Sequence, residues 1–529
     1  MWVVAPSAKA SLVLYNGTII TMSRHKPKAQ AVAIVNEKIA KVGTNDEVSR
    51  LIGPQTQVVN LNGKTVIPGL IDTHIHVADF GKILSWLDLR HAKSILEVKK
   101  QISRFVKKTP KEKWVIGYGL GGINLKALIL DEVAPENPII LYHQKGRMCV
   151  VNSKALKLAG ITKDTPSPQG GEIEKDPITG EPTGVLHESA TDLVWKIVPQ
   201  PTEEELMEQV ELAFKKIVEA GLTTVHWIVT SSSELDLVAN LLERERLPLR
   251  IRLIVPISMQ QHPVIGVVKK KNHPYIKLLG FMIFADGSLS AQTAALSKPY
   301  TNIPTAGNLL QTEEKMCKLI SEVLEGGLQP IIHAMGDRAI DQALSAIQKF
   351  IEKIHCDKFR PIIEQPAILN LELINRMKNL KVIASIQPLC MITEFETWSA
   401  IQRLGQERAR WLYPLKTLMS TGVLVSGGSD CPMEPLNPFS QIKASVTRPY
   451  FREEQVTIDE ALRMYTTNAA YASFEEDLIG TIEEGKLADL TVISHNPYEI
   501  NPDRLDKIDV EMTIVGGRIV YQRDIGVFA

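Results

Sequence analysis

The sequence is poor in the features that mark membrane proteins, disulfide-linked secreted proteins and nucleic-acid-binding proteins. No apolar run approaches the roughly 18 residues of a membrane-spanning helix, and the N-terminus lacks the apolar core of a signal peptide. The 529 residues include only five cysteines, odd in number and widely scattered, which predicts a reducing, cytoplasmic location and no disulfide framework. Basic and acidic residues number 60 each, so no net charge favours nucleic acid or an anionic membrane.

Several catalytic signatures are also missing. The chain has no Gly-rich P-loop for a nucleotide phosphate, no Gly-x-Ser-x-Gly elbow of a serine hydrolase, and no Rossmann fingerprint after its first strand. What remains is the balance of a globular protein, with 44% apolar and 23% charged residues. The chain is long enough to form two or three hydrophobic cores.

The most informative segment is residues 66–76, which read Val-Ile-Pro-Gly-Leu-Ile-Asp-Thr-His-Ile-His. Its apolar, nearly charge-free start is typical of a buried strand. Alternate side chains of a strand share a face, so we expect His74 and His76 to point the same way. Because imidazole is a common ligand of zinc and iron, the pair predicts half of a tetrahedral metal site. The alternative is two ordinary histidines on an exposed strand.

The chain ends are rich in short strands, and the middle alternates strands with helices. Residues 11–15 precede Asn16-Gly17, a hairpin signal, and similar strands recur after residue 486. We therefore predict a small β-sandwich built from residues 1–66 and 486–529. In the middle, a helix is expected over residues 202–220. Strands are expected over residues 222–226, 250–257, 281–284, 329–333, 361–364, 382–387 and 423–426.

This alternation predicts an α/β fold with a parallel sheet. A histidine pair of metal type at the C-terminal end of the first strand favours closure of that sheet into a (β/α)8 TIM barrel. We predict the barrel over residues 67–81 and 191–485. Residues 82–190 exceed one ordinary strand–helix step, which favours an inserted α/β subdomain over plain barrel helices.

Six segments in this order resemble amidohydrolase family 3 of the amidohydrolase superfamily. This branch contains N-substituted formamide deformylases and hydrolases similar to an exoenzyme regulatory protein. The resemblance covers almost the whole chain and implies the same barrel, terminal sandwich and insertion, and relatives often form homodimers. The segments are residues 68–76, 151–156, 284–289, 333–339, 427–430 and 483–490.

The resemblance implies that His74, His76, His333 and Asp430 are the metal ligands. His333 ends an apolar strand, and Asp430 follows two glycines, where backbone can approach a ligand closely. Three imidazoles and one carboxylate suit one divalent ion, Zn²⁺ in the first place and Fe²⁺ as the alternative. By resemblance, Asp430 also takes a proton from the attacking water and passes it to the leaving nitrogen. A core histidine and a capping aspartate are the structural alternatives.

Four positions depart from the family pattern. The family's lysine ahead of Ala-Asp-Gly is Met282 here, which cannot form the carbamate that bridges two metals in many relatives. Lys277 lies at an odd offset from it, which would put it on the other face of the strand. The family's strand-six histidine is Gln365, which can hydrogen-bond water or substrate but binds these metals poorly. Arg147 and Cys390 stand where relatives have histidines.

These residues leave two functions open. The first is a hydrolase with one metal ion that cleaves a carbon–nitrogen bond other than a peptide bond in a small molecule, such as an amide, formamide or cyclic amidine. Its expected catalytic residues are Asp430, Gln365 and Glu188, the last from a family position near the site. The second is a catalytically impaired relative that binds or senses a small molecule. Neither function involves nucleic acid or a membrane.

Overall fold

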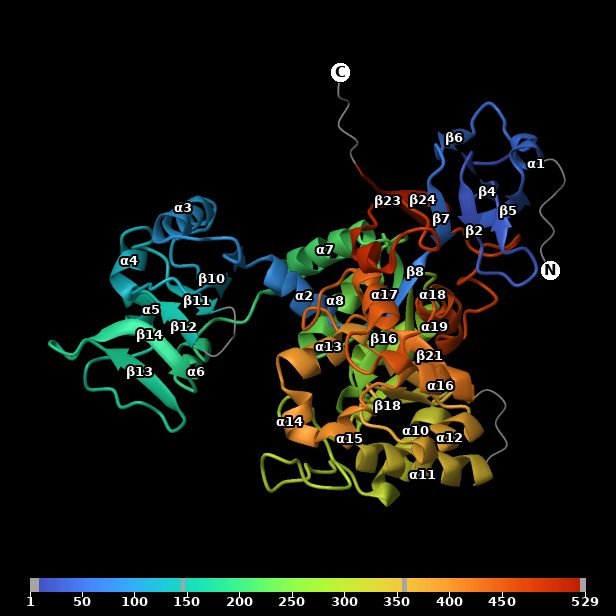
Figure 1. The fold of residues 1–529 in the computed structure, drawn as a ribbon. Helices are drawn as coiled ribbons and strands as arrows, with labels where there is room; N and C mark the ends of the chain where they lie inside the picture. Colours follow the sequence, from blue (N-terminus) through green and yellow to red (C-terminus); the bar gives the residue numbers. More distant parts are fainter. Residues whose placement is uncertain (1–8, 144–147, 354–358, 524–529) are drawn as a thin grey trace. The chain divides into compact units, whose positions relative to one another are not determined.

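The computed structural model describes residues 9–143, 148–353 and 359–523. Within them the chain forms two compact units, residues 81–212 and the remainder. The larger unit contains an eight-stranded parallel sheet and two smaller sheets, and residues 81–212 contain a six-stranded sheet (Figure 1). The predicted α/β fold class is confirmed. The limits assigned to the three domains stay predictions.

The eight-stranded sheet forms the barrel, with its strands in chain order and every hydrogen-bonded pair parallel. It closes just beyond its last strand, where Asp430 N donates to His74 O at 2.8 Å and His76 N donates to Cys431 O at 2.9 Å. The predicted TIM barrel is therefore confirmed. Its strands are β8 (Leu70–Ile75), β15 (Leu222–Ile228), β16 (Arg250–Pro256), β17 (Ile276–Phe284), β18 (Gln329–His333), β19 (Ile362–Glu364), β20 (Ile383–Ile386) and β21 (Leu424–Gly427).

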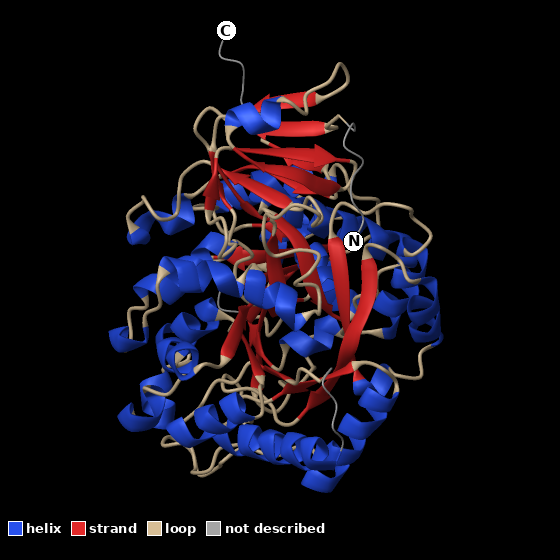
Figure 2. Cartoon of the chain, turned by 90° about the vertical axis from the view of Figure 1, so that its right-hand side faces the viewer, coloured by secondary structure: helices blue, strands red, loops and turns tan. Residues whose placement is uncertain are grey.

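Helices enclose the barrel strands, as Figure 2 shows in blue around red. Helix α7 has three glutamates in its first turn, where they complement the helix dipole, and its apolar side is buried as its spacing predicts. Among the helices of the described residues, none has the length and apolar character needed to cross a bilayer. The helices around the barrel are α2 (Val77–Leu84), α7 (Glu203–Glu219), α8 (Ser232–Leu241), α9 (Pro263–Lys271), α10 (Glu313–Glu325), α11 (Asp337–Lys353), α12 (Leu371–Asn379), α13 (Pro388–Glu396), α14 (Ala400–Leu404), α15 (Gln406–Ala409), α16 (Leu415–Thr421), α17 (Pro438–Thr447), α18 (Ile458–Met464) and α19 (Thr467–Ala472).

An apolar layer fills the middle of the barrel. Ile254, Met282, Ile331 and Ile362 come from four successive strands and are all buried in one cluster. Polar side chains collect at the two ends of the strands, on either side of this layer. Because active sites of such barrels are built at the C-terminal ends of the strands, the end that carries His74 is the expected functional end.

The two chain ends form two sheets that share one apolar core. The predicted hairpin at Asn16-Gly17 is wrong. Asn16 has φ +59° and turns the chain, but β1 pairs with β4 and β6 while β2 pairs with β7 and β3. The turn carries the chain across the sandwich, because Leu14 and Ile19 enter the same core from opposite sheets. The sheets are β5 (Lys38–Gly43), β4 (Ala31–Val35), β1 (Leu12–Tyr15), β6 (Gln57–Asn60), and β24 (Arg518–Gln522), β23 (Val510–Val515), β22 (Leu490–Ile493), β7 (Thr65–Pro68), β2 (Thr18–Ile20), β3 (Lys28–Ala29), with α1 (Asn45–Ser49) beside the first.

Residues 81–212 contain a mixed sheet with short helices. Its aromatic cluster joins Trp86, Tyr142 and Trp195, whose ring centroids lie 5.9–6.2 Å apart. Lys82 Nζ lies 5.1 Å from the centroid of Trp195, within the range of a cation–π contact. The strands are, in sheet order, β13 (Gly171–Lys175), β14 (Pro182–Glu188), β12 (Met148–Val151), β11 (Ile139–His143), β10 (Val115–Leu120) and β9 (Leu87–Asp88), and the helices are α3 (Ile95–Val106), α4 (Ala127–Asp131), α5 (Ser153–Leu158) and α6 (Thr191–Trp195).

Candidate metal centre

The two histidines of the first barrel strand approach one carboxylate. His74 lies in β8, all six residues of which are buried, and His76 follows the strand. His74 Nε2 lies 3.5 Å and His76 Nε2 lies 3.3 Å from Asp430 Oδ1. The three side chains offer ligand atoms within 4.8 Å of one another. The structure thus brings together three of the four residues predicted as ligands.

Asp430 reaches this position because the chain after β21 passes very close to β8. A Cβ atom on Gly428 would lie 2.6 Å from His74 N, closer than real Cβ contacts, so only glycine fits there. Asp72 fastens the approach, since its Oδ1 accepts hydrogen bonds from His74 N at 3.0 Å and Ser429 N at 2.9 Å. Burial raises the pKa of the Asp72 carboxyl to about 6.

A buried carboxylate orients His74. Glu364, at the end of β19 and 1% exposed, places Oε2 2.9 Å from His74 Nδ1. Because Nδ1 donates its hydrogen to this oxygen, Nε2 is the nitrogen that faces Asp430, and it is the one a metal ion can bind once its proton has left. Burial lowers the pKa of the His74 ring, but Glu364 and Asp430 outweigh burial and raise it to about 9. A metal ion must therefore displace a proton from His74.

Gln365 lies between His333 and Asp430. Its Oε1 is 3.0 Å from His333 Nε2, and its Nε2 donates to Asp430 Oδ2 at 3.1 Å. Gln365 has φ +55°, a conformation uncommon outside glycine, and this backbone turns the amide toward both partners. Among the described residues His333 is not part of the cluster of close ligand atoms. Its role as a fourth ligand stays a prediction.

Neither Met282, at the family's lysine position, nor Lys277 reaches the candidate site. Met282 is 1% exposed within the apolar layer of the barrel, below the candidate site. Lys277 Nζ lies 2.8 Å from Glu475 Oε1 near the start of β17. Lys277 therefore does not substitute for the family's lysine, because it serves the opposite end of the strand.

Three other residues singled out in the sequence are Cys390, Glu188 and Arg147. Cys390 Sγ is 3.9 Å from Asp430 Oδ2, and burial raises the pKa of its thiol well above the ordinary value, so it stays protonated. Glu188 ends β14 in the unit of residues 81–212 and is described with that unit. Its catalytic role stays a prediction. Arg147 lies outside the described residues.

Sequence reasoning missed Glu364 and Asp72. Both stand in buried strands, where an ionised carboxylate is costly unless it is hydrogen-bonded. This cost is a signal in the sequence, because each acidic residue inside an apolar strand needs a hydrogen-bond donor. The donor to Glu364 is the ring of His74, and the donors to Asp72 are the backbone N–H groups of His74 and Ser429.

The fold and the position of this cluster define a TIM-barrel protein with a candidate metal site at the C-terminal ends of its strands. A model of the amidohydrolase family matches residues 57–521. The chain is 32% identical to YtcJ of Bacillus subtilis, which is named a putative amidohydrolase, over 97% of this chain and 99% of that one. The chain belongs to the amidohydrolase family, and the resemblance seen in the sequence is confirmed.

Two further relatives bear on chemistry. N-substituted formamide deformylase of Arthrobacter pascens is 29% identical over 97% of this chain and 98% of its own length. A crystal structure from Pyrococcus furiosus, described as an uncharacterized metal-dependent hydrolase, superposes with a TM-score of 0.76. It is 28% identical and covers 92% of this chain and 100% of its own.

Proposed function

We propose that this protein is a metal-dependent hydrolase that cleaves a carbon–nitrogen bond other than a peptide bond in a small molecule. The observation that carries the proposal is the convergence of His74, His76 and Asp430 at the C-terminal end of the barrel. The Arthrobacter deformylase supports the bond type, with an amide, formamide or cyclic amidine as the substrate class. The Pyrococcus hydrolase supports the dependence on metal.

The donor set fits one divalent ion. Two imidazole nitrogens and a carboxylate oxygen suit Zn²⁺, our first choice, or Fe²⁺. Glu364 holds Nδ1 of His74, so the ring offers Nε2 to the ion, and His333 is the proposed fourth ligand once its Nε2 leaves Gln365. When bound, the ion supplies Lewis-acid polarisation of the scissile group and lowers the pKa of water to about 7.

Asp430 is the proposed base. Burial raises the pKa of its carboxyl, but the hydrogen bond from His76 and the charge of His74 outweigh burial, and the net pKa is below the ordinary value. Its Oδ2, held by the Gln365 amide, would accept a proton from the attacking water and deliver it to the leaving nitrogen. In this proposal Gln365 positions Asp430 and contacts water or substrate, and Glu188 moves a proton or binds substrate.

Elemental analysis tests the metal, and turnover tests the reaction. Protein purified without chelator or histidine tag should contain about one zinc or iron per chain, and should hydrolyse at least one member of a panel of N-substituted formamides, amides and cyclic amidines. His74→Ala and Asp430→Asn should lose both properties. His495→Ala is the matched control, because His495 is an exposed histidine bonded to Ser494. Substoichiometric metal together with no turnover across the panel would argue against the proposal.

A second candidate is an impaired relative that binds or senses a small molecule without turnover. It is favoured by Gln365, which engages His333 Nε2 and Asp430 Oδ2 together, and by the burial of Met282 in apolar surroundings. The double variant Met282→Lys with Gln365→His separates the candidates. Hydrolysis gained by the variant, where the natural chain has none, would favour the impaired relative.

The cysteine content predicts a cytoplasmic location, and the family resemblance implies a homodimer. Both stay predictions. Sedimentation of the purified chain tests the homodimer directly.

A further inference from the structure

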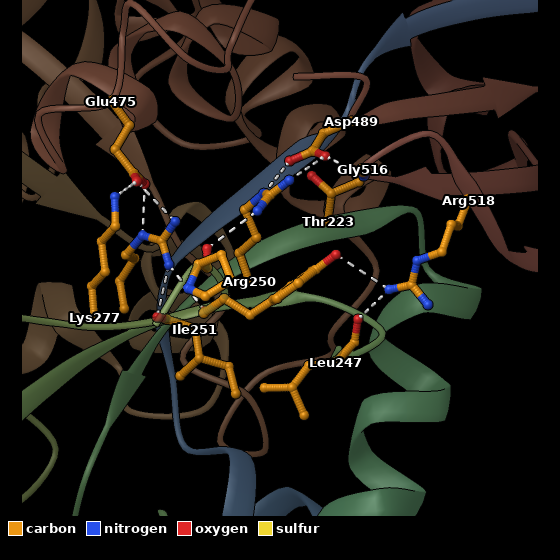
Figure 3. A network of polar contacts seen from close by, with 12 residues as sticks. Thr223, Leu247, Arg250, Ile251, Lys277, Glu475, Asp489, Gly516 and Arg518 are labelled. Atoms are coloured by element: carbon orange, nitrogen blue, oxygen red, sulfur yellow. Dashed lines mark hydrogen bonds and ion pairs between the residues drawn. The ribbon is translucent and has the colours of Figure 1, made fainter. Parts of the chain in front are cut away.

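The N-terminal end of the barrel carries a second polar cluster. Arg252 donates to both carboxylate oxygens of Glu475, at 2.6 and 2.8 Å, and Lys277 Nζ donates to Oε1 at 2.8 Å. Figure 3 shows Lys277 and Glu475 converging in this network. A neighbouring pair, Arg250 and Asp489, has no net charge, and two guanidinium nitrogens donate to the two carboxylate oxygens.

The cluster around Glu475 has more positive than negative charge. Burial raises the pKa of the Glu475 carboxyl, but Arg252 and Lys277 outweigh burial and lower it to about 2, so it is ionised. His226 adds no charge, because burial and Arg252 lower the pKa of its ring to about 3. Two cations thus face one carboxylate. Lys277 carries the surplus at the surface, with 40% of its side chain exposed.

The surplus charge lies in the wall of a cavity of about 420 Å³. Besides Lys277 and Arg252, its lining is largely aliphatic and aromatic, with Leu324, Leu328 and Phe474 as the main apolar members. Arg360 lies 4.1 Å from the ring centroid of Phe474 and holds that ring in place from outside the cavity. A volume of this size is in the range that small ligands occupy.

We propose that this cavity binds a small carboxylic acid with an aliphatic chain. The carboxylate would lie against the ammonium group of Lys277, which has three N–H donors and gives one to Glu475. The chain would lie against Leu324, Leu328 and Phe474, where burial of apolar area stabilises it. Surplus positive charge excludes an amine, and the apolar lining disfavours a fully polar anion.

This site is separate from the candidate metal centre. Lys277 stands near the start of β17 and Phe284 ends it, beside His333. Seven residues of extended strand span roughly 23 Å. The apolar layer that contains Met282 lies between the two ends of the barrel. The inference therefore does not depend on the proposed hydrolytic reaction.

Isothermal titration of the whole chain with octanoate tests the proposal. Octanol lacks the charge, octylamine reverses it and acetate lacks the chain, so each should bind at least about tenfold more weakly than octanoate. Binding should also weaken as salt is raised, because Lys277 is partly exposed. No heat of binding with octanoate, or equal binding of octylamine, would overturn the proposal.

Variants locate the binding. Lys277→Gln should weaken octanoate binding at least about tenfold, the scale of a charge-assisted hydrogen bond, and Lys277→Arg should retain it. Lys271→Gln is the matched control, since this exposed lysine pairs with Glu243 elsewhere. If Lys277→Gln fails to fold by circular dichroism, Leu328→Asp, on a half-exposed loop residue, serves instead.

His74→Ala shows whether octanoate binds at the metal centre instead, because carboxylates are also metal ligands. Octanoate affinity unchanged in His74→Ala and lost in Lys277→Gln supports the proposed site. Affinity lost in His74→Ala, or retained in both Lys277→Gln and Leu328→Asp, overturns it.

Discussion

Glu364 shows how one buried side chain determines what its neighbour can do. Its carboxylate is almost fully enclosed and has the ring of His74 as its close partner, at 2.9 Å. An enclosed charge of this kind is tolerated only when it is paired and hydrogen-bonded. The pair in turn fixes which nitrogen of His74 faces Asp430, so the metal-binding capacity of a histidine in β8 depends on a residue from β19.

Replacing Glu364 with glutamine should weaken metal binding while keeping side-chain volume. We expect the Kd for zinc to rise about 10- to 100-fold, the usual effect of losing a partner that orients a ligating histidine. Competition with a chromophoric chelator measures the Kd. Glu372→Gln, at an exposed position of α12, is the control and should leave the Kd unchanged. If the two variants bound zinc with equal affinity, Glu364 would have no part in orienting His74 for the metal.

Zinc affinity should depend on pH through His74. Because the pKa of the metal-free ring is raised to about 9, zinc must displace a proton below that value. The apparent affinity should therefore rise by about tenfold per pH unit between about pH 6.5 and 9 and level off above it. Chelator competition at a series of pH values measures this slope. A flat profile over that range would contradict it.

The same pKa shift has a consequence for the metal-free chain. The folded pKa of His74 lies above its ordinary value of 6.5, so the stability it contributes is fully present below about pH 6.5 and is lost as pH rises through about 9. Urea unfolding in the presence of chelator should show this loss. In His74→Ala the loss should be absent.

At the scale of elements, strand ends explain what the sequence could predict. Apolar runs that alternate with helical patterns predict the barrel strands, and strand alternation predicts that His74 and His76 share a face. The role of Asp430 as a ligand comes from the family resemblance, and its place just beyond a strand and two glycines agrees with that role. The sequence predicts a strand only over residues 281–284, whereas β17 begins at Ile276. The part that the prediction misses contains Lys277. A charged residue indicates an exposed position, and only the structure shows that Lys277 pairs with Glu475.

The contacts between side chains of different strands could not be predicted in the same way. That Gln365 bridges His333 and Asp430 depends on the distance between β18 and the loop after β21, which no periodicity encodes. In the same way, the sequence places Glu364 at the end of a strand but does not predict that it pairs with His74. The sequence therefore predicts which residues reach the end of the barrel, and packing decides how they pair there.

Gly428 lets the last strand approach the first. Gly428→Ala should push the loop after β21 away from β8, because its Cβ would meet His74 N at 2.6 Å. We expect loss of metal binding and a stability loss of about 1–3 kcal/mol, typical of overpacking. Urea unfolding and elemental analysis measure both effects.

Gly266→Ala is the matched control for Gly428→Ala. A Cβ at Gly266 meets nothing within 4 Å, and the residue lies inside helix α9. This variant should keep its metal and gain about 0.5–1 kcal/mol from the better helix former. If both glycine variants retained the metal equally, metal binding would not depend on the close approach of the loop after β21 to β8 at Gly428.

For the whole molecule, the candidate site coincides with the point where the barrel closes. His74 and His76 belong to the first strand and Asp430 to the loop after the last, and backbone hydrogen bonds join these segments. A metal ion held by all three would therefore link the two edges of the sheet. Binding to the folded chain alone adds about 2.7 kcal/mol of stability at a concentration 100 times the Kd.

Hydrogen exchange can locate this stabilisation, because the chain consists of two compact units. Adding zinc to chelator-treated protein should slow exchange in peptides that cover β8 and β21 and leave β10 and β12 of residues 81–212 unchanged. His74→Ala should abolish the protection, whereas His495→Ala should keep it. Equal protection in both units, or protection that survives His74→Ala, would mean that zinc acts elsewhere. Protection confined to β8 and β21 would show that the metal ligands also complete the barrel.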